Sequence, residues 1–168
     1  MQEILVITNH IRGASIGFLL MLIVFSGKVM GQVVEVPADV QFLLFTKILT
    51  FDRSIETTPH PDGALHMGIL YQEKQRNSTR ERDAMVNAIK TSAIKEVNGL
   101  RIEYELIAIP DGVPISKVLT GRKVDMLYIT PLRAVAIGEI FELSRAKKIL
   151  TFTAVPDYCE QGASVGVE

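Results

Sequence analysis

The chain has 168 residues, of which 48% are hydrophobic and 22% are charged, and its formal net charge is -1 at pH 7. This length and apolar content suit one globular domain with a core of its own. The near-neutral charge without basic runs argues against nucleic-acid binding, because neutralising phosphates needs clustered lysine and arginine. The single cysteine, Cys159, excludes an intrachain disulfide and a CxxC redox or zinc motif.

An apolar run lies near the amino terminus at residues 14–25, ASIGFLLMLIVF, with Arg12 before it and Lys28 after it. It is shorter than the roughly 20 apolar residues that a transmembrane helix needs. We therefore predict a signal peptide over residues 1–31 and an exported mature chain over residues 32–168. An uncleaved membrane anchor and a buried core helix are the two alternatives.

A strongly apolar helix is predicted from Pro37, because hydrophobic residues then recur every three or four positions. The recurring residues are Val40, Leu43, Leu44, Ile48 and Phe51, and the stripe is widened by Phe42, Phe45 and Leu49. A helix that is apolar nearly all round is normally interior, so the pattern favours a deeply buried helix over an exposed docking surface. Residues 57–63, TTPHPDG, follow as a turn-rich linker.

A strand is predicted at residues 64–71, and a helix follows it. Ser78 and Glu81 have the spacing of a capping box at the start of that helix. Asn98 and Gly99 tolerate the left-handed backbone conformation that ends a helix, so the helix is expected to extend to them.

The next strand, at residues 101–109, alternates at its start and is wholly apolar at its end, which predicts a half-exposed position at an edge of the sheet. A short helix at residues 114–120 and a strand at residues 124–129 come next. Thr130 followed by Pro131 has the form of an N-cap and a first-turn proline, and predicts that a long helix opens there.

Residues 149–153 predict a strand buried on both faces, followed by a helical turn at Pro156 and a second apolar strand at residues 163–167. The order of elements predicts an α/β fold, with a mainly parallel sheet and helices on both faces in a single small domain. Because the chain ends at Glu168, directly after a strand, we expect the domain to be truncated at its carboxyl terminus.

Candidate site residues are few, and none forms a catalytic or metal-binding constellation, so we expect neither an enzyme nor a cofactor. His60 and His66 lack ligand partners at helical spacing, and Cys159 would need a histidine brought close by the fold to act as a nucleophile. In open α/β sheets, ligands usually bind just past the carboxyl ends of the strands. The candidate ligand- or partner-binding residues there are Thr130, Thr153, Tyr158, Gln161, Gly162 and Ser164.

Several segments together form a recognisable pattern: LTGR at residues 119–122, DMLYI at 125–129, ILT at 149–151, the run at 156–166, and FLLFTKILTFDR at 42–53. In these segments the chain resembles the YfiR family of small periplasmic proteins, over nearly all of the predicted mature chain. The most recognisable part is a leucine-threonine strand, a short turn, Glu-Gln-Gly and a glycine-containing strand. Here it stands at Leu150-Thr151, Glu160-Gln161-Gly162 and Val165-Gly166.

The resemblance implies a periplasmic α/β domain that works by binding. The best-understood role in the family is repression of an inner-membrane diguanylate cyclase through its periplasmic sensor region, which links it to cyclic di-GMP, biofilm control and envelope stress. The expected partner is therefore the periplasmic region of an inner-membrane signalling protein, and a homodimer is a second expected assembly. No nucleic-acid partner and no membrane insertion after signal cleavage are expected.

Two departures from the family and one alternative function accompany this expectation. Cysteine-paired members have redox-sensitive disulfides, which a chain with Cys159 alone does not form, and members also continue into a further strand and helix. The alternative is a periplasmic solute-binding module, with a ligand held at the strand ends by Thr130, Thr153, Gly162 and Ser164.

Overall fold

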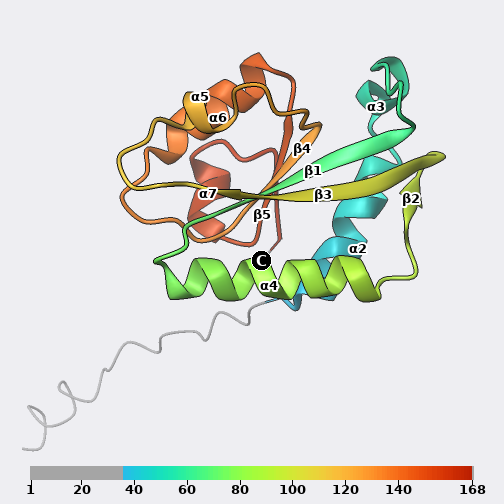
Figure 1. Cartoon of the computed structure of the whole chain (residues 1–168). Helices are drawn as coiled ribbons and strands as arrows, with labels where there is room; N and C mark the ends of the chain where they lie inside the picture. Colours follow the sequence, from blue (N-terminus) through green and yellow to red (C-terminus); the bar gives the residue numbers. More distant parts are fainter. Residues whose placement is uncertain (1–35, 168) are drawn as a thin grey trace, which may run out of the picture. The chain divides into compact units, whose positions relative to one another are not determined.

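A six-stranded sheet forms the centre of the computed structural model, which describes residues 36–167 (Figure 1). The strand order is β2-β3-β1-β4-β5-β6, and every neighbouring pair is parallel except β2 and β3. The described elements are, in chain order, α2 (Ala38–Leu49), α3 (Arg53–Thr57), β1 (Ala64–Tyr71), α4 (Arg76–Thr91), β2 (Glu96–Val97), β3 (Leu100–Ala108), α5 (Ile115–Val118), β4 (Met126–Ile129), α6 (Ile137–Ala146), β5 (Leu150–Thr153), α7 (Pro156–Glu160) and β6 (Val165–Gly166).

Helices cover both faces of the sheet. Side chains of α2 and α4 pack on one face, and side chains of α5, α6 and α7 pack on the other. Successive residues of β4 divide between the two cores, because neighbouring strand residues point to opposite faces. Met126 and Tyr128 lie under α2 and α4, whereas Leu127 and Ile129 belong to the second core. The predicted α/β fold, mainly parallel and covered on both sides, is confirmed.

Strand β1 lies between β3 and β4 and matches its predicted bounds. Its mostly apolar sequence, interrupted by His66, follows from this position, because both of its faces are covered. Gly68 lies in its middle, where an added Cβ would stand 2.7 Å from Ile107 Cδ1 and 2.8 Å from Leu127 Cδ2. The missing side chain therefore lets residues of the two flanking strands close over β1.

The carboxyl-terminal segment also follows the prediction. The strand before Pro156 is β5, the helical turn is α7, and the final apolar run contributes β6, which pairs in parallel with β5. Pro156 occupies the start of α7, where a missing amide hydrogen costs nothing.

The predicted start of α4 is wrong. The helix begins at Arg76, so Ser78 lies inside it and is buried. The Ser78 hydroxyl accepts a hydrogen bond from the Gln72 backbone amide at 2.9 Å and lies 2.6 Å from the Thr130 hydroxyl. The serine thus joins α4 to the end of β4 instead of capping the helix.

The predicted end of α4 is wrong as well, because the helix stops at Thr91. Asn98 and Gly99 both have positive φ, 50° and 78°, and form the turn of a hairpin between β2 and β3. An Asn-Gly pair is the preferred sequence of such a two-residue hairpin turn. Strand β2 pairs only with the first two residues of β3, so most of that strand lies at the sheet edge, as predicted.

The helix expected from Thr130 begins only at Ile137. Thr130 is fully buried, and its hydroxyl donates to the Leu70 carbonyl at 2.9 Å. The threonine is therefore used to bind β1 rather than to cap α6.

Helix α2 exists as predicted, but the expectation that it is deeply buried is wrong. Only one side of it packs on the sheet, through Phe42, Phe45 and Leu49, and the residues expected to form the buried stripe are exposed. The predicted signal peptide at residues 1–31 lies outside the described residues. Within residues 36–167, no helix has both the length and the apolar character needed to cross a membrane.

Candidate functional site

The outward side of α2 carries an exposed apolar stripe, which we call the α2 face. Leu43 is 53% exposed and Phe51, just past the helix, is 77% exposed. The members of the α2 face are Val40, Leu43, Leu44, Ile48 and Phe51. Their spacing of three and four residues places them in one row along the helix, so they form a continuous surface instead of scattered contacts.

Buried polar groups fix which side of α2 faces the sheet. Gln41 is buried on the inner side, and its Nε2 donates to the Val36 carbonyl at 2.7 Å and to Glu81 Oε1 at 3.3 Å. The Tyr128 hydroxyl lies 2.8 Å from Gln41 Oε1 and 2.6 Å from Glu81 Oε1, and it donates to these acceptors. We call Gln41, Glu81 and Tyr128 the Gln41 network. It joins α2, α4 and β4.

The electrostatics of this network favour a neutral tyrosine. Burial, and secondly the neighbouring Glu81 carboxylate, raise the pKa of the Tyr128 hydroxyl far above its ordinary value. The hydroxyl therefore keeps its proton throughout the usual pH range and remains a donor to Gln41 and Glu81.

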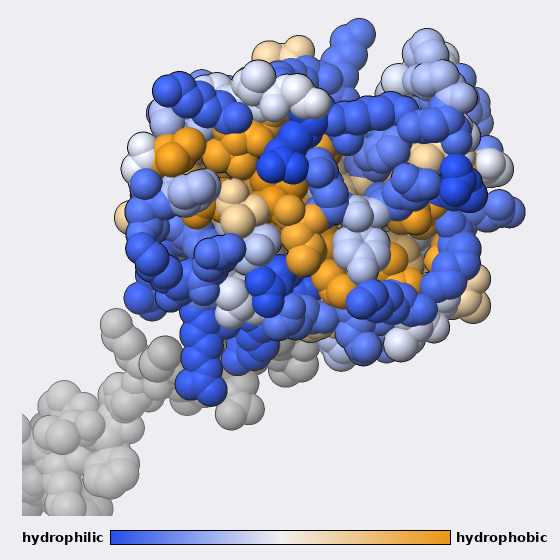
Figure 2. Space-filling view, in the orientation of Figure 1, coloured by the Kyte–Doolittle hydropathy of each residue, from blue (hydrophilic) through white to orange (hydrophobic). Residues whose placement is uncertain are grey.

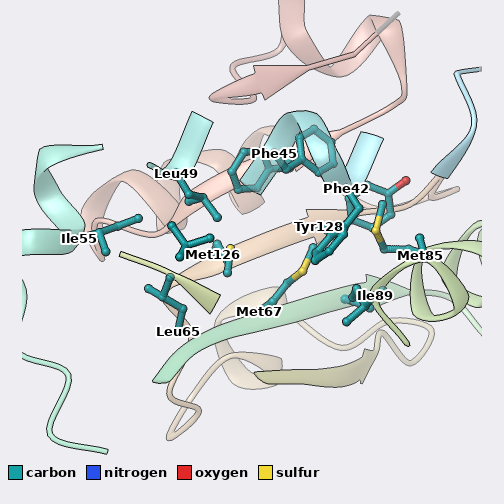
Figure 3. Packing of buried hydrophobic residues seen from close by; sticks show 14 residues of the cluster. Phe42, Phe45, Leu49, Ile55, Leu65, Met67, Met85, Ile89, Met126 and Tyr128 are labelled. Carbon is teal, nitrogen blue, oxygen red and sulfur yellow. The ribbon is translucent and has the colours of Figure 1, made fainter. Parts of the chain in front are cut away.

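Aromatic packing holds the same side of α2 (Figure 3). The Phe45 ring centroid lies 4.5 Å from that of Phe152 and 5.9 Å from that of Tyr128, both in tilted arrangements. Figure 3 shows Phe42 and Phe45 reaching from α2 into the cluster that Met85 and Ile89 enter from α4. The inner side of α2 is thus occupied, and the α2 face has no partner within the described chain.

Two exposed charges accompany the α2 face. Asp39 lies in the first turn of α2 and Lys47 in its last turn. Among the described residues neither forms an ion pair. A partner that lies along the helix would therefore meet a negative charge near one end and a positive charge near the other.

A second apolar surface lies on another part of the molecule. Figure 2 shows apolar side chains in the middle of the face across which β3 runs in Figure 1, bordered by hydrophilic ones. Leu106 of β3 is 44% exposed. It is the only strongly exposed large apolar residue among the described residues of β3, so it does not form a row comparable to the α2 face.

Several of the polar residues that were predicted to form a binding site instead make hydrogen bonds to backbone groups within the fold. Thr153 is fully buried, and its hydroxyl donates to the Ile129 carbonyl at 3.0 Å. The Tyr158 hydroxyl accepts from the Leu132 amide at 2.8 Å, and burial raises its pKa. Thr130 binds β1 as described above. These groups position loops at the carboxyl ends of the strands.

The remaining predicted site residues lie around α7. Gln161 is exposed, and its Nε2 donates to the Asp157 carbonyl at 3.2 Å. An added Cβ on Gly162, whose φ is +112°, would stand 3.1 Å from the Arg145 guanidinium. The Ser164 hydroxyl lies 3.0 Å from the Thr151 hydroxyl. The structure therefore does not bring the six predicted residues together around one open space.

A cavity does lie at the carboxyl ends of β4 and β5, but different residues line it. Its volume is about 310 Å³, and the Gln41 network lines part of it, together with Pro131 and Val155. The sequence did not point to Gln41, which stands in its helix without a motif, and it assigned Glu81 to a capping box with Ser78 instead of to this site. Within residues 36–167, no three histidine, cysteine or acidic side chains are grouped so as to hold a metal ion.

No family model matches this chain, and no curated protein matches it.

Proposed function

We propose that this chain is an exported regulatory protein that docks on the periplasmic region of an inner-membrane diguanylate cyclase and represses it. The observation that carries the proposal is the α2 face, a row of five exposed apolar side chains on a helix whose other side is fixed to the sheet. Apolar surfaces of this kind typically mark contacts between proteins. The resemblance to the YfiR family supports the choice of partner.

The partner element that fits this surface is an amphipathic helix. A row with spacings of three and four residues packs against a second helix, whose own apolar side chains enter the gaps between turns. Asp39 and Lys47, at opposite ends of α2, favour one direction of that helix. Leu43 and Leu44 lie at the centre of the row, where contacts contribute most to binding.

A double substitution, Leu43→Glu with Leu44→Glu, is expected to weaken binding at least about tenfold, because it places two charges in the centre of an apolar contact. In cells that lack the protein, cyclic di-GMP is expected to rise. The wild-type chain should restore the low level, and the double variant should not, at equal protein abundance.

Leu106→Glu is the control, because it also replaces an exposed leucine by glutamate, but on β3 and away from the α2 face, and it should restore the low level fully. Unchanged cyclic di-GMP after deletion, or full complementation by the double variant, would contradict the proposal. Gel filtration of the purified proteins tests whether the α2 face binds a second copy of this chain instead. That would follow if the wild type forms a dimer, and the double variant loses the dimer but still restores the low level fully.

The solute-binding alternative has less support at the positions predicted for it. The hydroxyl groups of Thr130, Thr153 and Ser164 already have partners in the fold. Docking is therefore the function that the described surface supports best.

A further inference from the structure

We infer that a second site, at the amino ends of the strands, binds a small aliphatic carboxylate that carries a hydroxyl or oxo group. The site is a cavity of about 170 Å³ between the α2–α3 connection and the starts of β1, β4 and β5. It lies at the opposite end of the sheet from the predicted site, and it does not depend on the docking proposed above.

A buried histidine without a partner points to a ligand. The His60 side chain is only 5% exposed and lines the cavity. Within the described chain neither of its ring nitrogens forms a hydrogen bond. The nearest carboxylate oxygen, Asp125 Oδ2, is 3.8 Å from Nδ1, which is too long for a hydrogen bond. Since buried polar groups are normally paired, the imidazole fits a polar group that arrives with a ligand.

The acidic residues of the cavity are already engaged by backbone amides. Asp125 Oδ2 accepts from the His66 amide at 2.8 Å, and Asp52 Oδ1 accepts from the Ser54 amide at 2.8 Å, which caps α3. Both carboxylates therefore have a role in holding the loops that form the walls. Because one oxygen of each carboxylate is already occupied by an amide, the two residues attract a cationic ligand less than free carboxylates would.

The basic residues of the cavity are not engaged in this way. Lys147 and Lys148 line it and are exposed, and among the described residues neither forms an ion pair. The positive charges of these two residues favour an anionic ligand group. A carboxylate suits them, because its oxygens accept hydrogen bonds from both lysines.

The walls define the rest of the ligand. They contain no phenylalanine, tyrosine or tryptophan, and their apolar members are Leu49, Ile55, Leu65, Val124, Met126 and Leu150. A cavity of roughly 150 Å³ lined by such side chains holds a benzene molecule, so this one accepts a body of about six carbon atoms. A branched hydroxy acid of that size would place its carboxylate at the lysines and its hydroxyl at His60.

Isothermal titration calorimetry on the full-length chain tests the inference with three probes of one shape: leucic acid, isocaproate and isoamylamine. We expect leucic acid to bind best, isocaproate about tenfold more weakly, and the amine not at all. His60→Leu should remove the preference for the hydroxy acid while still binding isocaproate, because leucine preserves the apolar wall.

Lys147→Gln with Lys148→Gln should weaken both acids about tenfold, whereas Lys117→Gln, an exposed lysine outside the cavity, should change neither. Thermal unfolding of each variant confirms that it is folded. Three results would overturn the inference: no heat from either acid at about 10 mM, equal binding of the amine, or an unchanged hydroxy-acid preference in folded His60→Leu.

Discussion

Phe45→Ala is expected to lower the free energy of unfolding by about 3–5 kcal/mol, the usual cost of removing a buried aromatic ring. Phe45 is 1% exposed and contacts the rings of Tyr128 and Phe152. The alanine would leave a void between α2 and the sheet that rigid strands fill poorly. Equilibrium unfolding in urea, followed by circular dichroism, measures the loss.

Leu43→Ala is the matched control, because it lies two residues away on the same helix and is 53% exposed. It should change the free energy of unfolding by no more than about 0.5 kcal/mol. Equal losses at the two positions would mean that α2 packs on the sheet through both sides, and the α2 face would then not be free to bind a partner.

Tyr128→Phe is expected to cost about 1–3 kcal/mol near neutral pH. The substitution keeps the ring and its packing on Phe45, but it removes the hydroxyl that donates to Gln41 and Glu81. Both acceptors would then lose a donor in a partly closed site. The same urea experiment measures this loss, and a neutral result would mean that the Gln41 network does not hold α2 in place.

The same variant makes a prediction about alkaline pH. Because burial raises the pKa of Tyr128 in the folded protein, the unfolded state loses its phenolic proton first, at about pH 10. The contribution of the hydroxyl is therefore fully present below that pH and is lost as the pH rises further. The free energies of unfolding of wild type and Tyr128→Phe should approach each other above about pH 10, and curves that stay parallel would contradict the raised pKa.

The central strands β1, β4 and β5 were predictable because they are covered on both faces. Such strands are continuous apolar runs, and turn residues bound them, so β1 and the segment from β5 to β6 follow from local sequence. The wrong predictions of helix ends arose where one local sequence pattern is compatible with two different structures. Asn98 and Gly99 close a hairpin rather than a helix, and Ser78 and Thr130 bind each other across the chain instead of capping helices.

The orientation of α2 was not predictable from hydrophobicity alone, because apolar residues occur on both of its sides. The deciding groups are polar: Gln41 and Thr46 fall on the side of Phe42 and Phe45, and both are buried. Gln41 turns inward because Tyr128 and Glu81 offer hydrogen bonds there. Those residues are 87 and 40 positions away, so no local pattern reveals them.

The cavity around His60 also depends on contacts between residues that are distant in the sequence. His60 stands between two prolines, which predicts an exposed turn, yet the fold places it beside Asp125 and buries its ring. The residues at the start of β4, which are distant from His60 in the sequence, supply one wall of this cavity. Burial and the missing partner therefore become visible only in three dimensions.

The open edge of β3 carries a consequence for self-assembly. Past its first two residues, this strand has no outer neighbour among residues 36–167, so its peptide groups would accept a strand from another molecule. Glu103 and Glu105 lie along that strand and pair with Arg101 at 3.1 Å and with Arg122 at 2.9 Å, so a strand added at this edge would meet charged side chains. Charged side chains along an open edge oppose its pairing with another molecule, so the protein should resist amyloid formation in concentrated solution even though one edge of its sheet is open.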